Sequence, residues 1–196
     1  MPHRIAKIKR KTKETDIELT LDLDGTGKFK VQTPTPFLTH MIEVFTKHSG
    51  FDLILRASGD TQIDDHHTVE DIGICLGEAL SEALDTKEGI ARFGYAYVPL
   101  DEALVRAVVD LSGRSHLNLA ISLPPKKKLG TFDSELVDDF FEAFTENAKI
   151  NLHLEMIHCR NSHHIVEAAF KSLARALRMA TALDGRSGVP STKGTL

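Results

Sequence analysis

Two five-residue segments of this sequence carry the same arrangement of imidazole and carboxylate side chains. The segment at 66–70 reads His-His-Thr-Val-Glu, and the segment at 163–167 reads His-His-Ile-Val-Glu. Divalent metal ions of intermediate softness, such as manganese, iron, cobalt and zinc, bind mixed sets of imidazole nitrogens and carboxylate oxygens. These two segments, called the pentads below, therefore predict two halves of a metal centre.

Each pentad is expected to begin a long amphipathic helix. A polar residue suited to a helix N-cap comes directly before each pentad, Asp65 in the first copy and Ser162 in the second. Residues four apart share one face of a helix, so the first histidine of a pentad lies over its glutamate. The pairs predicted in this way are His66 with Glu70 and His163 with Glu167.

The second histidine of each pentad points in another direction. His67 and His164 project about 100° away from the histidine before them, because a helix has about 3.6 residues per turn. Two arrangements let both histidines bind metal. In one, the first histidine of one half of the chain meets the second histidine of the other half. In the other, ligands are shared between neighbouring subunits.

The pentads occupy matching positions in an internally duplicated chain. An offset of 97 residues relates the two pentads. An offset of 88 relates the Asp-Leu-x-Gly sequences at 22–25 and 110–113, and one of 99 relates the Glu-x-Phe-Thr sequences at 43–46 and 142–145. The offsets differ by insertions in loops, where added residues cost little. The duplication predicts two halves, residues 1–92 and 93–196, each with the order β-β-β-α-β-α.

Apolar periodicity places the elements of an α+β fold along both halves. In the first half it predicts strands near 3–10, 16–23, 28–32 and 51–57, and helices near 37–48 and 66–84. In the second half it predicts strands near 103–111, 116–121 and 149–157, and helices near 134–147 and 163–180. The Asp-Gly-Thr-Gly sequence at 24–27 predicts a hairpin between the second and third strands, and the turn at 112–115 corresponds to it.

Comparison of the halves also predicts a further pair of ligands. At the offset of 99, His40 aligns with Asp139, and each precedes a Phe-containing helical segment by the same step. If His40 binds metal in one half, Asp139 is the candidate in the other half.

A second group of residues suits a phosphate, because guanidinium, ammonium and hydroxyl groups donate hydrogen bonds to its oxygens. These polar candidates lie in loops or near the ends of elements: Glu14, Arg92, Arg114, Lys171 and the C-terminal Ser191-Thr192-Lys193-Gly194. The sequence has no Gly-rich nucleotide loop, no Gly-x-Ser-x-Gly and no His-Glu-x-x-His motif. The Gly- and Ser-rich segment from Gly185 onward predicts a mobile tail that closes on the substrate.

The composition excludes several classes of partner. The net charge is −4 and the isoelectric point about 6.2, so neither nucleic acid nor an anionic membrane is expected to bind. Apolar runs are far shorter than the roughly 20 residues that cross a bilayer, and the N-terminus lacks the apolar segment of a signal peptide. Two cysteines, Cys75 and Cys159, are too few for a disulfide framework, which favours the reducing cytoplasm.

The pentads and three other segments together resemble imidazoleglycerol-phosphate dehydratase. The resemblance runs from about residue 3 to the end of the chain, and its segments occur in the family's order. They are Phe37-Leu38-Thr39-His40-Met41, the sequence from Ile63 to Asp71, Leu111-Ser112-Gly113-Arg114, the sequence from Asn161 to Ala168, and Ser191-Thr192-Lys193-Gly194.

The resemblance implies an enzyme of histidine biosynthesis. It implies a hydro-lyase that removes water from D-erythro-imidazole-glycerol phosphate to give imidazole-acetol phosphate, with two manganese ions in each active site. It also implies two four-stranded sheets with the helices packed between them. The subunits would form a homo-oligomer, an octahedral 24-mer assembled from trimers, with active sites between subunits. The chain begins directly at the first strand, so we expect a monofunctional enzyme without a transit peptide.

The same resemblance assigns roles to single residues. The implied manganese ligands are His40, His66, His67, Glu70, Asp139, His163, His164 and Glu167. The implied substrate-binding residues are Glu14, His40, Arg92, Arg114, Lys171, Ser191 and Lys193. The implied catalytic residues are Glu14, Glu70, Glu167, His67 and His164, among which Glu14 or Glu167 would move protons.

Asp139 departs from the family pattern, because many members have histidine or glutamate at this position. Aspartate still offers an oxygen ligand, but its side chain is shorter than either. We therefore expect the two halves of the metal centre to be unequal, with a weaker, water-bridged or absent ligand at Asp139.

Two other functions are compatible with these residues. A non-catalytic shell assembled by metal explains the pentads and the duplication, but it leaves the basic residues without a role. A metallohydrolase would direct a metal-bound water at a phosphate ester and use the same basic residues. Formation of a ketone without release of phosphate distinguishes the dehydratase from both.

Overall fold

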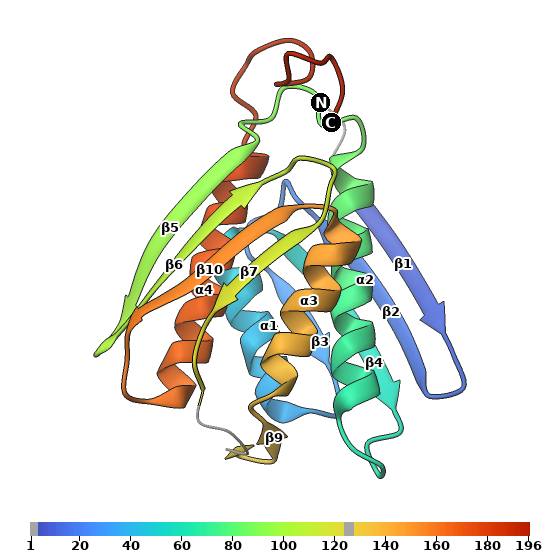
Figure 1. Cartoon of the computed structure of the whole chain (residues 1–196). Coiled ribbons are helices and arrows are strands. Elements are labelled where there is room, and N and C mark those ends of the chain that lie inside the picture. The colour runs from blue at the N-terminus through green and yellow to red at the C-terminus, as the bar shows by residue number, and fades with distance from the viewer. Residues whose placement is uncertain (1–3, 124–127) are drawn as a thin grey trace.

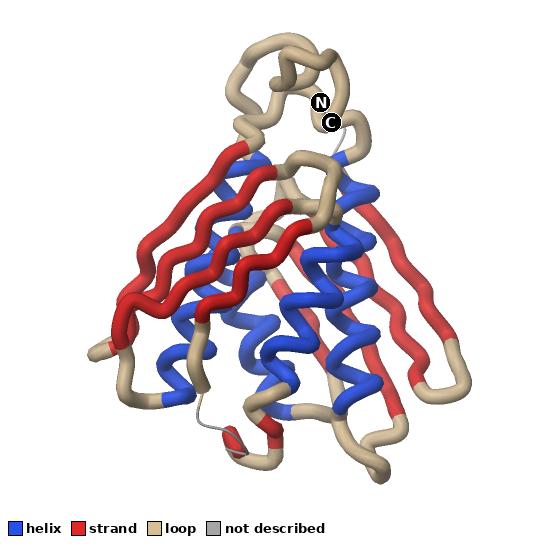
Figure 2. The backbone as a smooth tube through the Cα atoms, viewed as in Figure 1, coloured by secondary structure: helices blue, strands red, loops and turns tan. Residues whose placement is uncertain are grey.

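Two four-stranded sheets form the outer layers of the molecule, and four helices lie between them (Figures 1 and 2). The computed structural model describes residues 4–123 and 128–196. The predicted α+β class, with helices between two duplicated sheets, is confirmed. No helix within the described ranges has both the length and the apolar character needed to cross a membrane.

The first half follows the predicted order of elements, and the second half follows it apart from two additional short strands before its first helix. The first half contains β1 (Ile5–Lys11), β2 (Thr15–Asp22), β3 (Phe29–Gln32), α1 (Pro36–Ser49), β4 (Asp52–Gly59) and α2 (His66–Leu84). The second half contains β5 (Phe93–Leu100), β6 (Ala103–Asp110), β7 (His116–Ala120), a short ribbon of β8 (Lys128–Leu129) and β9 (Phe132–Asp133), α3 (Leu136–Ala148), β10 (Asn151–His158) and α4 (Ser162–Thr181). His3, at which the first strand is predicted to begin, lies outside the described residues.

The predicted hairpin at 24–27 is wrong. The strand order is β1-β2-β4-β3, so β3 lies parallel to β4 and does not pair with β2. Asp52 at the start of β4 explains the difference, because its Oδ1 accepts hydrogen bonds from the backbone N–H groups of Thr26 and Lys28 at 2.7 and 2.8 Å. A Cβ atom on Gly25 would lie 2.3 Å from the backbone nitrogen of Asp52, so this close approach requires glycine.

The turn at 112–115 does not form a hairpin either. The second sheet has the order β5-β6-β10-β7, in which β7 lies parallel to β10. Asn151 at the start of β10 ties the turn down, because its side-chain amide donates a hydrogen bond to the carbonyl oxygen of Arg114 at 2.9 Å. In both halves the turn thus carries the chain past the central strand to the far edge of the sheet.

The helices pair across the two halves. α1 of the first half packs against α4 of the second, and α2 of the first half packs against α3 of the second. α2 and α3 come very close, since a Cβ atom on Gly77 would lie 2.6 Å from the carbonyl oxygen of Phe144. Apolar residues of both halves form one continuous core. Each pentad helix therefore lies beside a helix from the other half.

The acceptors at the starts of the pentad helices are not the predicted ones. Ser162 is the first residue of α4, and Asn161 is the N-cap, with a side chain that accepts a hydrogen bond from the backbone N–H of His163 at 3.0 Å. At α2, Asp64 accepts from the backbone N–H of His66 at 2.8 Å, while Asp65 makes no capping bond. Asp64 and Asn161 are related by the offset of the pentads, so the duplication extends to the caps.

The contact between α2 and α3 generates a prediction about stability. Gly77→Ala would push a methyl group into the backbone of α3, so we expect it to lower the free energy of unfolding by about 1–3 kcal/mol. Scanning calorimetry measures this as a lower Tm. Glu82→Ala, on the exposed side of the same helix, is the matched control and should change stability by less than about 0.5 kcal/mol. Equal Tm values for the two variants would contradict the close packing.

Candidate functional site

All four helices begin at one end of the molecule, drawn at the bottom of Figure 1. Thr35, before α1, donates a side-chain hydrogen bond to Asp65 before α2 at 3.1 Å, and the ring centroid of Phe37 in α1 lies 5.5 Å from that of His163 in α4. Helix N-termini carry partial positive charge, which disfavours protonated imidazole and favours ionised carboxylate. The pentads therefore lie where neutral histidines and charged glutamates are both stabilised.

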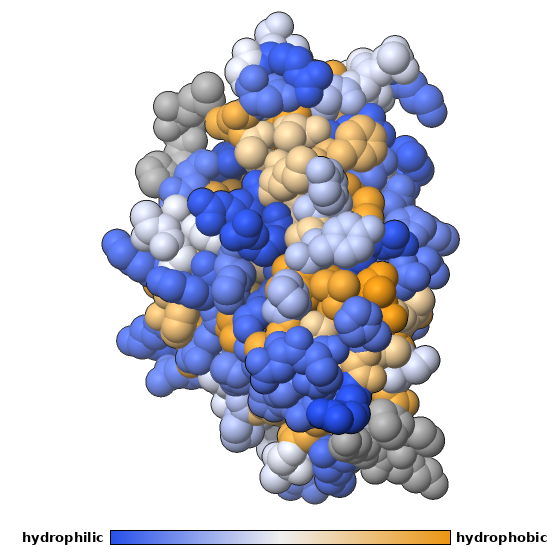
Figure 3. Space-filling view, turned by 90° about the vertical axis from the view of Figure 1, so that its left-hand side faces the viewer, coloured by the Kyte–Doolittle hydropathy of each residue, from blue (hydrophilic) through white to orange (hydrophobic). Residues whose placement is uncertain are grey.

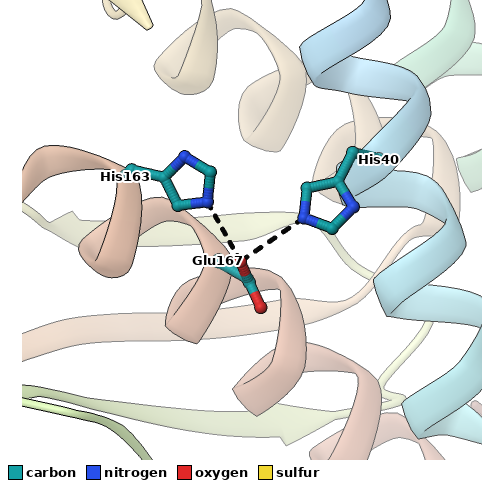
Figure 4. Close-up of side chains that lie close together, drawn as sticks. All are labelled: His40, His163 and Glu167. Carbon is teal, nitrogen blue, oxygen red and sulfur yellow. Dashed lines mark hydrogen bonds and ion pairs between the residues drawn. The ribbon is translucent and has the colours of Figure 1, made fainter.

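The first ligand cluster joins α1 of one half to α4 of the other (Figure 4). His163 Nε2 lies 3.1 Å from Glu167 Oε2, as the spacing of four residues predicts. His40 Nε2 approaches the same oxygen at 3.4 Å from the facing helix. Each residue offers one donor atom, and all three atoms lie within 4.8 Å of one another. This donor set has the composition and spacing that could hold a divalent cation.

Lys171 helps to keep Glu167 ionised. Its Nζ lies 2.6 Å from Glu167 Oε1, one helical turn further along α4. Burial raises the pKa of Glu167, but the hydrogen bonds from Lys171 and His163 and the nearby His40 outweigh burial and hold the pKa below its ordinary value. Lys171 therefore belongs to the pentad end of the molecule.

The second cluster is looser. His66 Nδ1 lies 3.5 Å from Asp139 Oδ2, across the contact between α2 and α3. The predicted pair of His66 with Glu70 forms no hydrogen bond or ion pair within the described part of the chain. His40 and Asp139 thus occupy matching places beside opposite pentads, and the structure makes the two clusters unequal. Whether Asp139 binds metal stays a prediction.

The second histidines turn away from these clusters. The rings of His66 and His67 meet at an interplanar angle of 88°, and those of His163 and His164 at 87°. Within the described residues, neither second histidine makes a ring contact with the first histidine of the other half. The structure of one chain therefore does not show the first of the two predicted arrangements, and the sharing of ligands between subunits stays a prediction.

Two carboxylates that contact the second histidines were not among the residues predicted for the site. His67 Nδ1 lies 3.1 Å from Asp60, and His164 Nδ1 lies 2.9 Å from Glu102. The hydrogen bond with Asp60 raises the pKa of His67, and the hydrogen bond with His164 lowers the pKa of Glu102 to about 2. A signal for Glu102 exists in the sequence, because it lies 88 residues after Glu14, the offset that relates the strands following them. No short motif marks Asp60.

The predicted phosphate-binding arginines lie at the opposite end of the molecule. Arg92 lies where α4 ends, with its backbone N–H donating to the carbonyl oxygen of Ala180 at 2.9 Å, and Arg114 follows β6 at the same end (Figure 1). α2 has 19 residues, and a rise of 1.5 Å per residue separates its ends by about 28 Å. Within one chain, the arginines and the pentads are therefore not brought together.

The C-terminal tail lies over Arg92. The guanidinium donates from Nε to Asp110 at 2.7 Å and from Nη1 to the carbonyl oxygen of Pro190 at 2.9 Å. Ser191 and Lys193 follow directly in the tail, so they also lie at the arginine end. The mobility of this tail and its closure on the substrate stay predictions.

A buried lysine at the arginine end was not among the predicted site residues. Lys87 lies three residues after the end of α2 and is only 6% exposed. Burial lowers its pKa, Asp110 opposes this effect, and the neighbouring Lys149, Arg92 and Arg114 reinforce it. These side chains make the arginine end cationic and suited to an anion. Only the burial of Lys87 reveals it, since no motif surrounds it.

Comparisons with known proteins agree with the geometry. A family model described as imidazoleglycerol-phosphate dehydratase matches residues 33–177. Curated proteins of that name include one from Desulforamulus reducens, 52% identical with 100% of both chains covered. Another, from Bacillus subtilis, is 54% identical and covers 95% of this chain and 96% of its own.

Solved structures show the same relationship. The imidazoleglycerol-phosphate dehydratase of Staphylococcus aureus aligns with a TM-score of 0.83 and 40% identity, over 91% of this chain and 99% of that one. The enzyme of Pyrococcus furiosus, solved in complex with (S)-C348, aligns with a TM-score of 0.81 and 39% identity, over 96% of this chain and 100% of that one. The chain belongs to the imidazoleglycerol-phosphate dehydratase family.

Membership of the dehydratase family confirms the predicted class of enzyme. Imidazoleglycerol-phosphate dehydratases are hydro-lyases of histidine biosynthesis. This assignment favours the dehydratase over the non-catalytic shell and the metallohydrolase, both of which rest on residues that the dehydratase family also explains.

The inequality of the two clusters generates a prediction about metal binding. We expect His40→Ala to weaken Mn²⁺ binding by at least about tenfold, or about 1.4 kcal/mol, because it removes one of three converging donors. Asp139→Ala should weaken binding less, since Asp139 approaches only His66. Calorimetric titration of the metal-free protein with MnCl₂ measures both. Equal losses in the two variants would contradict the asymmetry.

Proposed function

We propose that this chain carries out the manganese-dependent dehydration of D-erythro-imidazole-glycerol phosphate to imidazole-acetol phosphate, at sites formed between subunits. The observation that carries this proposal is the separation of about 28 Å between the pentads and the cationic end, from the length of α2. The substrate, a three-carbon chain with an imidazole at one end and a phosphate at the other, is far shorter than this distance. The pentads of one subunit must therefore meet the arginines of another.

The donor set supports a pair of manganese ions. His40, His163 and Glu167 would hold one ion, and His66 with Asp139 and Glu70 would contribute to the related cluster. Imidazole and carboxylate ligands in combination are compatible with Mn²⁺. When bound, the ions supply Lewis acidity and a template for the imidazole of the substrate.

Two carboxylates at the pentad end are candidates for the proton transfer. Dehydration removes a hydroxyl group from the carbon attached to the imidazole and a proton from the next carbon, and the resulting enol becomes the ketone. Glu14 is suited to carry this proton, because it is exposed and forms no side-chain hydrogen bond within the described residues. Glu167 is less available, since Lys171 and two histidines already engage its oxygens.

The cationic end would hold the substrate phosphate. Arg114 has most of its donors free, because its guanidinium bonds only the carbonyl oxygen of Ser112, at 3.3 Å, within the described residues. Arg92 is fixed by Asp110 and lies under the tail that carries Ser191 and Lys193. A mobile tail would add these two side chains after the phosphate enters.

The outer faces of the sheets support assembly into a homo-oligomer. Apolar side chains that a monomer would leave in water lie on both faces, and Figure 3 shows such groups among charged ones on one side. The first sheet exposes Ile5, Phe29 and Ile54, and the second exposes Phe93, Tyr95, Tyr97 and Val108. We propose that these faces bury one another in an octahedral 24-mer built from trimers. The free thiols of Cys75 and Cys159 suit the cytoplasm as its compartment.

An assay of both products tests the reaction. The purified protein with MnCl₂ should convert imidazole-glycerol phosphate into a ketone without releasing inorganic phosphate. Glu14→Gln should lower kcat by about 100-fold through loss of the proton carrier, with little change in KM. Phosphate release would instead identify a hydrolase, and the absence of both products would leave the metal-assembled shell.

Complementation tests whether the site is shared between subunits. His164→Ala damages the pentad end, and Arg114→Ala damages the cationic end, so each variant alone should lose most of its activity. Chains of both variants mixed into one assembly should regain activity, because about a quarter of randomly formed interfaces would join two undamaged ends.

The matched control mixes two variants that are both altered at the cationic end. Arg92→Ala mixed with Arg114→Ala should regain nothing, since every cationic end is then damaged. Recovery in this control, or none in the mixture of His164→Ala with Arg114→Ala, would contradict a site shared in this way.

A further inference from the structure

The second histidine of each pentad is held from its Nδ1 side. Glu102 Oε2 lies 2.9 Å from His164 Nδ1, and both oxygens of Asp60 lie near His67 Nδ1, at 3.1 and 3.3 Å. Glu102 is itself fixed, because its Oε1 accepts a hydrogen bond at 2.9 Å from the backbone N–H of Asn161, the N-cap of α4. Both oxygens of this carboxylate are therefore engaged.

This contact determines which nitrogen remains available. A neutral imidazole carries one proton, and a carboxylate at Nδ1 keeps that proton on Nδ1. The lone pair of Nε2 then points away from the carboxylate. Glu167 plays a different part, because it faces the Nε2 atoms of His163 and His40. The carboxylates at the first and second histidines thus differ in which nitrogen they approach.

The two halves supply the carboxylate at the second histidine from different positions of the internal repeat. β2 and β6 are related by an offset of 88, so the counterpart of Glu102 is Glu14. β4 and β10 are related by an offset of 99, so the counterpart of Asp60 is Cys159. Cys159 lies beside the carboxylate of its own half, with Sγ 3.9 Å from Glu102 Oε1.

The exchange has a consequence for Glu14. In the second half, Glu102, the glutamate directly before β6, forms a hydrogen bond with His164. In the first half, Asp60 makes that contact, so Glu14 forms no side-chain hydrogen bond within the described residues, although its charge still acts on His67. Two equivalent glutamates have therefore come to have different surroundings within one chain.

We propose that Asp60 and Glu102 are positioning residues, which orient His67 and His164 so that Nε2 of each is available as a metal ligand. We propose further that this leaves the Glu14 carboxylate without a hydrogen-bond partner and therefore available for the reaction. The proposal rests on the metal binding in the proposed function. It assigns no contact with the substrate to Asp60 or Glu102. It predicts that substitutions of Glu102 and Glu14, although these residues are equivalent in the repeat, affect different properties: Mn²⁺ affinity for Glu102 and kcat for Glu14.

Free Mn²⁺ in solution gives an EPR signal, so titration of the metal-free, full-length protein with MnCl₂ measures binding directly. We expect Glu102→Gln and Asp60→Asn to weaken Mn²⁺ binding by about 10–100-fold with the number of bound ions per chain unchanged. Glu14→Gln should bind Mn²⁺ like the unaltered protein and lose kcat. Glu82→Gln, the same change at the far, exposed end of α2, is the matched control and should leave binding unchanged.

The Tm of each metal-free variant separates positioning from a general loss of structure. A lower Mn²⁺ affinity with an unchanged Tm supports the proposal. Unchanged affinity in Glu102→Gln and Asp60→Asn would overturn it, and so would a lower number of bound ions, because Glu102 or Asp60 would then be a ligand itself. If the unaltered protein binds Mn²⁺ but does not dehydrate the substrate, the proposed function fails and the positioning role stands on the titration alone.

Discussion

The packing of each pentad helix against a helix from the other half is the constraint on which the site depends. Because α1 lies on α4 and α2 lies on α3, His40 reaches the second pentad and Asp139 reaches the first. Glycines in α2 permit this approach, since a Cβ atom at Gly77 would lie 2.6 Å from a backbone oxygen of α3. Each of these two clusters therefore draws its side chains from both halves of the chain.

The sequence predicted the position of a side chain well where a single regularity, such as the helical period or the repeat offset, determines that position. Helical periodicity was sufficient to place His163 over Glu167, and the offset between the halves was sufficient to match Asp139 with His40. The order of the strands was harder, because Asp52 captures the turn at 24–27 through hydrogen bonds that no local pattern reveals. Asp60 and Lys87 were missed for a similar reason, since their surroundings come from distant segments.

Duplication followed by divergence explains why the two halves are similar in framework and different in chemistry. The cap residues Asp64 and Asn161 accept equivalent hydrogen bonds, so the starts of both pentad helices are built alike. The side chains that face the pentads are not alike, because an imidazole faces one pentad and a short carboxylate faces the other. The backbone sets where a side chain can act, and single substitutions then decide what it does there.

The placement of the proposed metal ligands at one end and the cationic residues at the other gives the chain a direction. A contact between unlike ends is head-to-tail, so each added subunit offers a new end to the next one. The series closes only if the repeated rotation brings the last subunit back to the first. A closed shell is one outcome of that geometry, and an open filament is the other. In the proposed assembly, the angle between neighbouring subunits would determine whether growth stops, so the arrangement of the site would also govern the size of the particle.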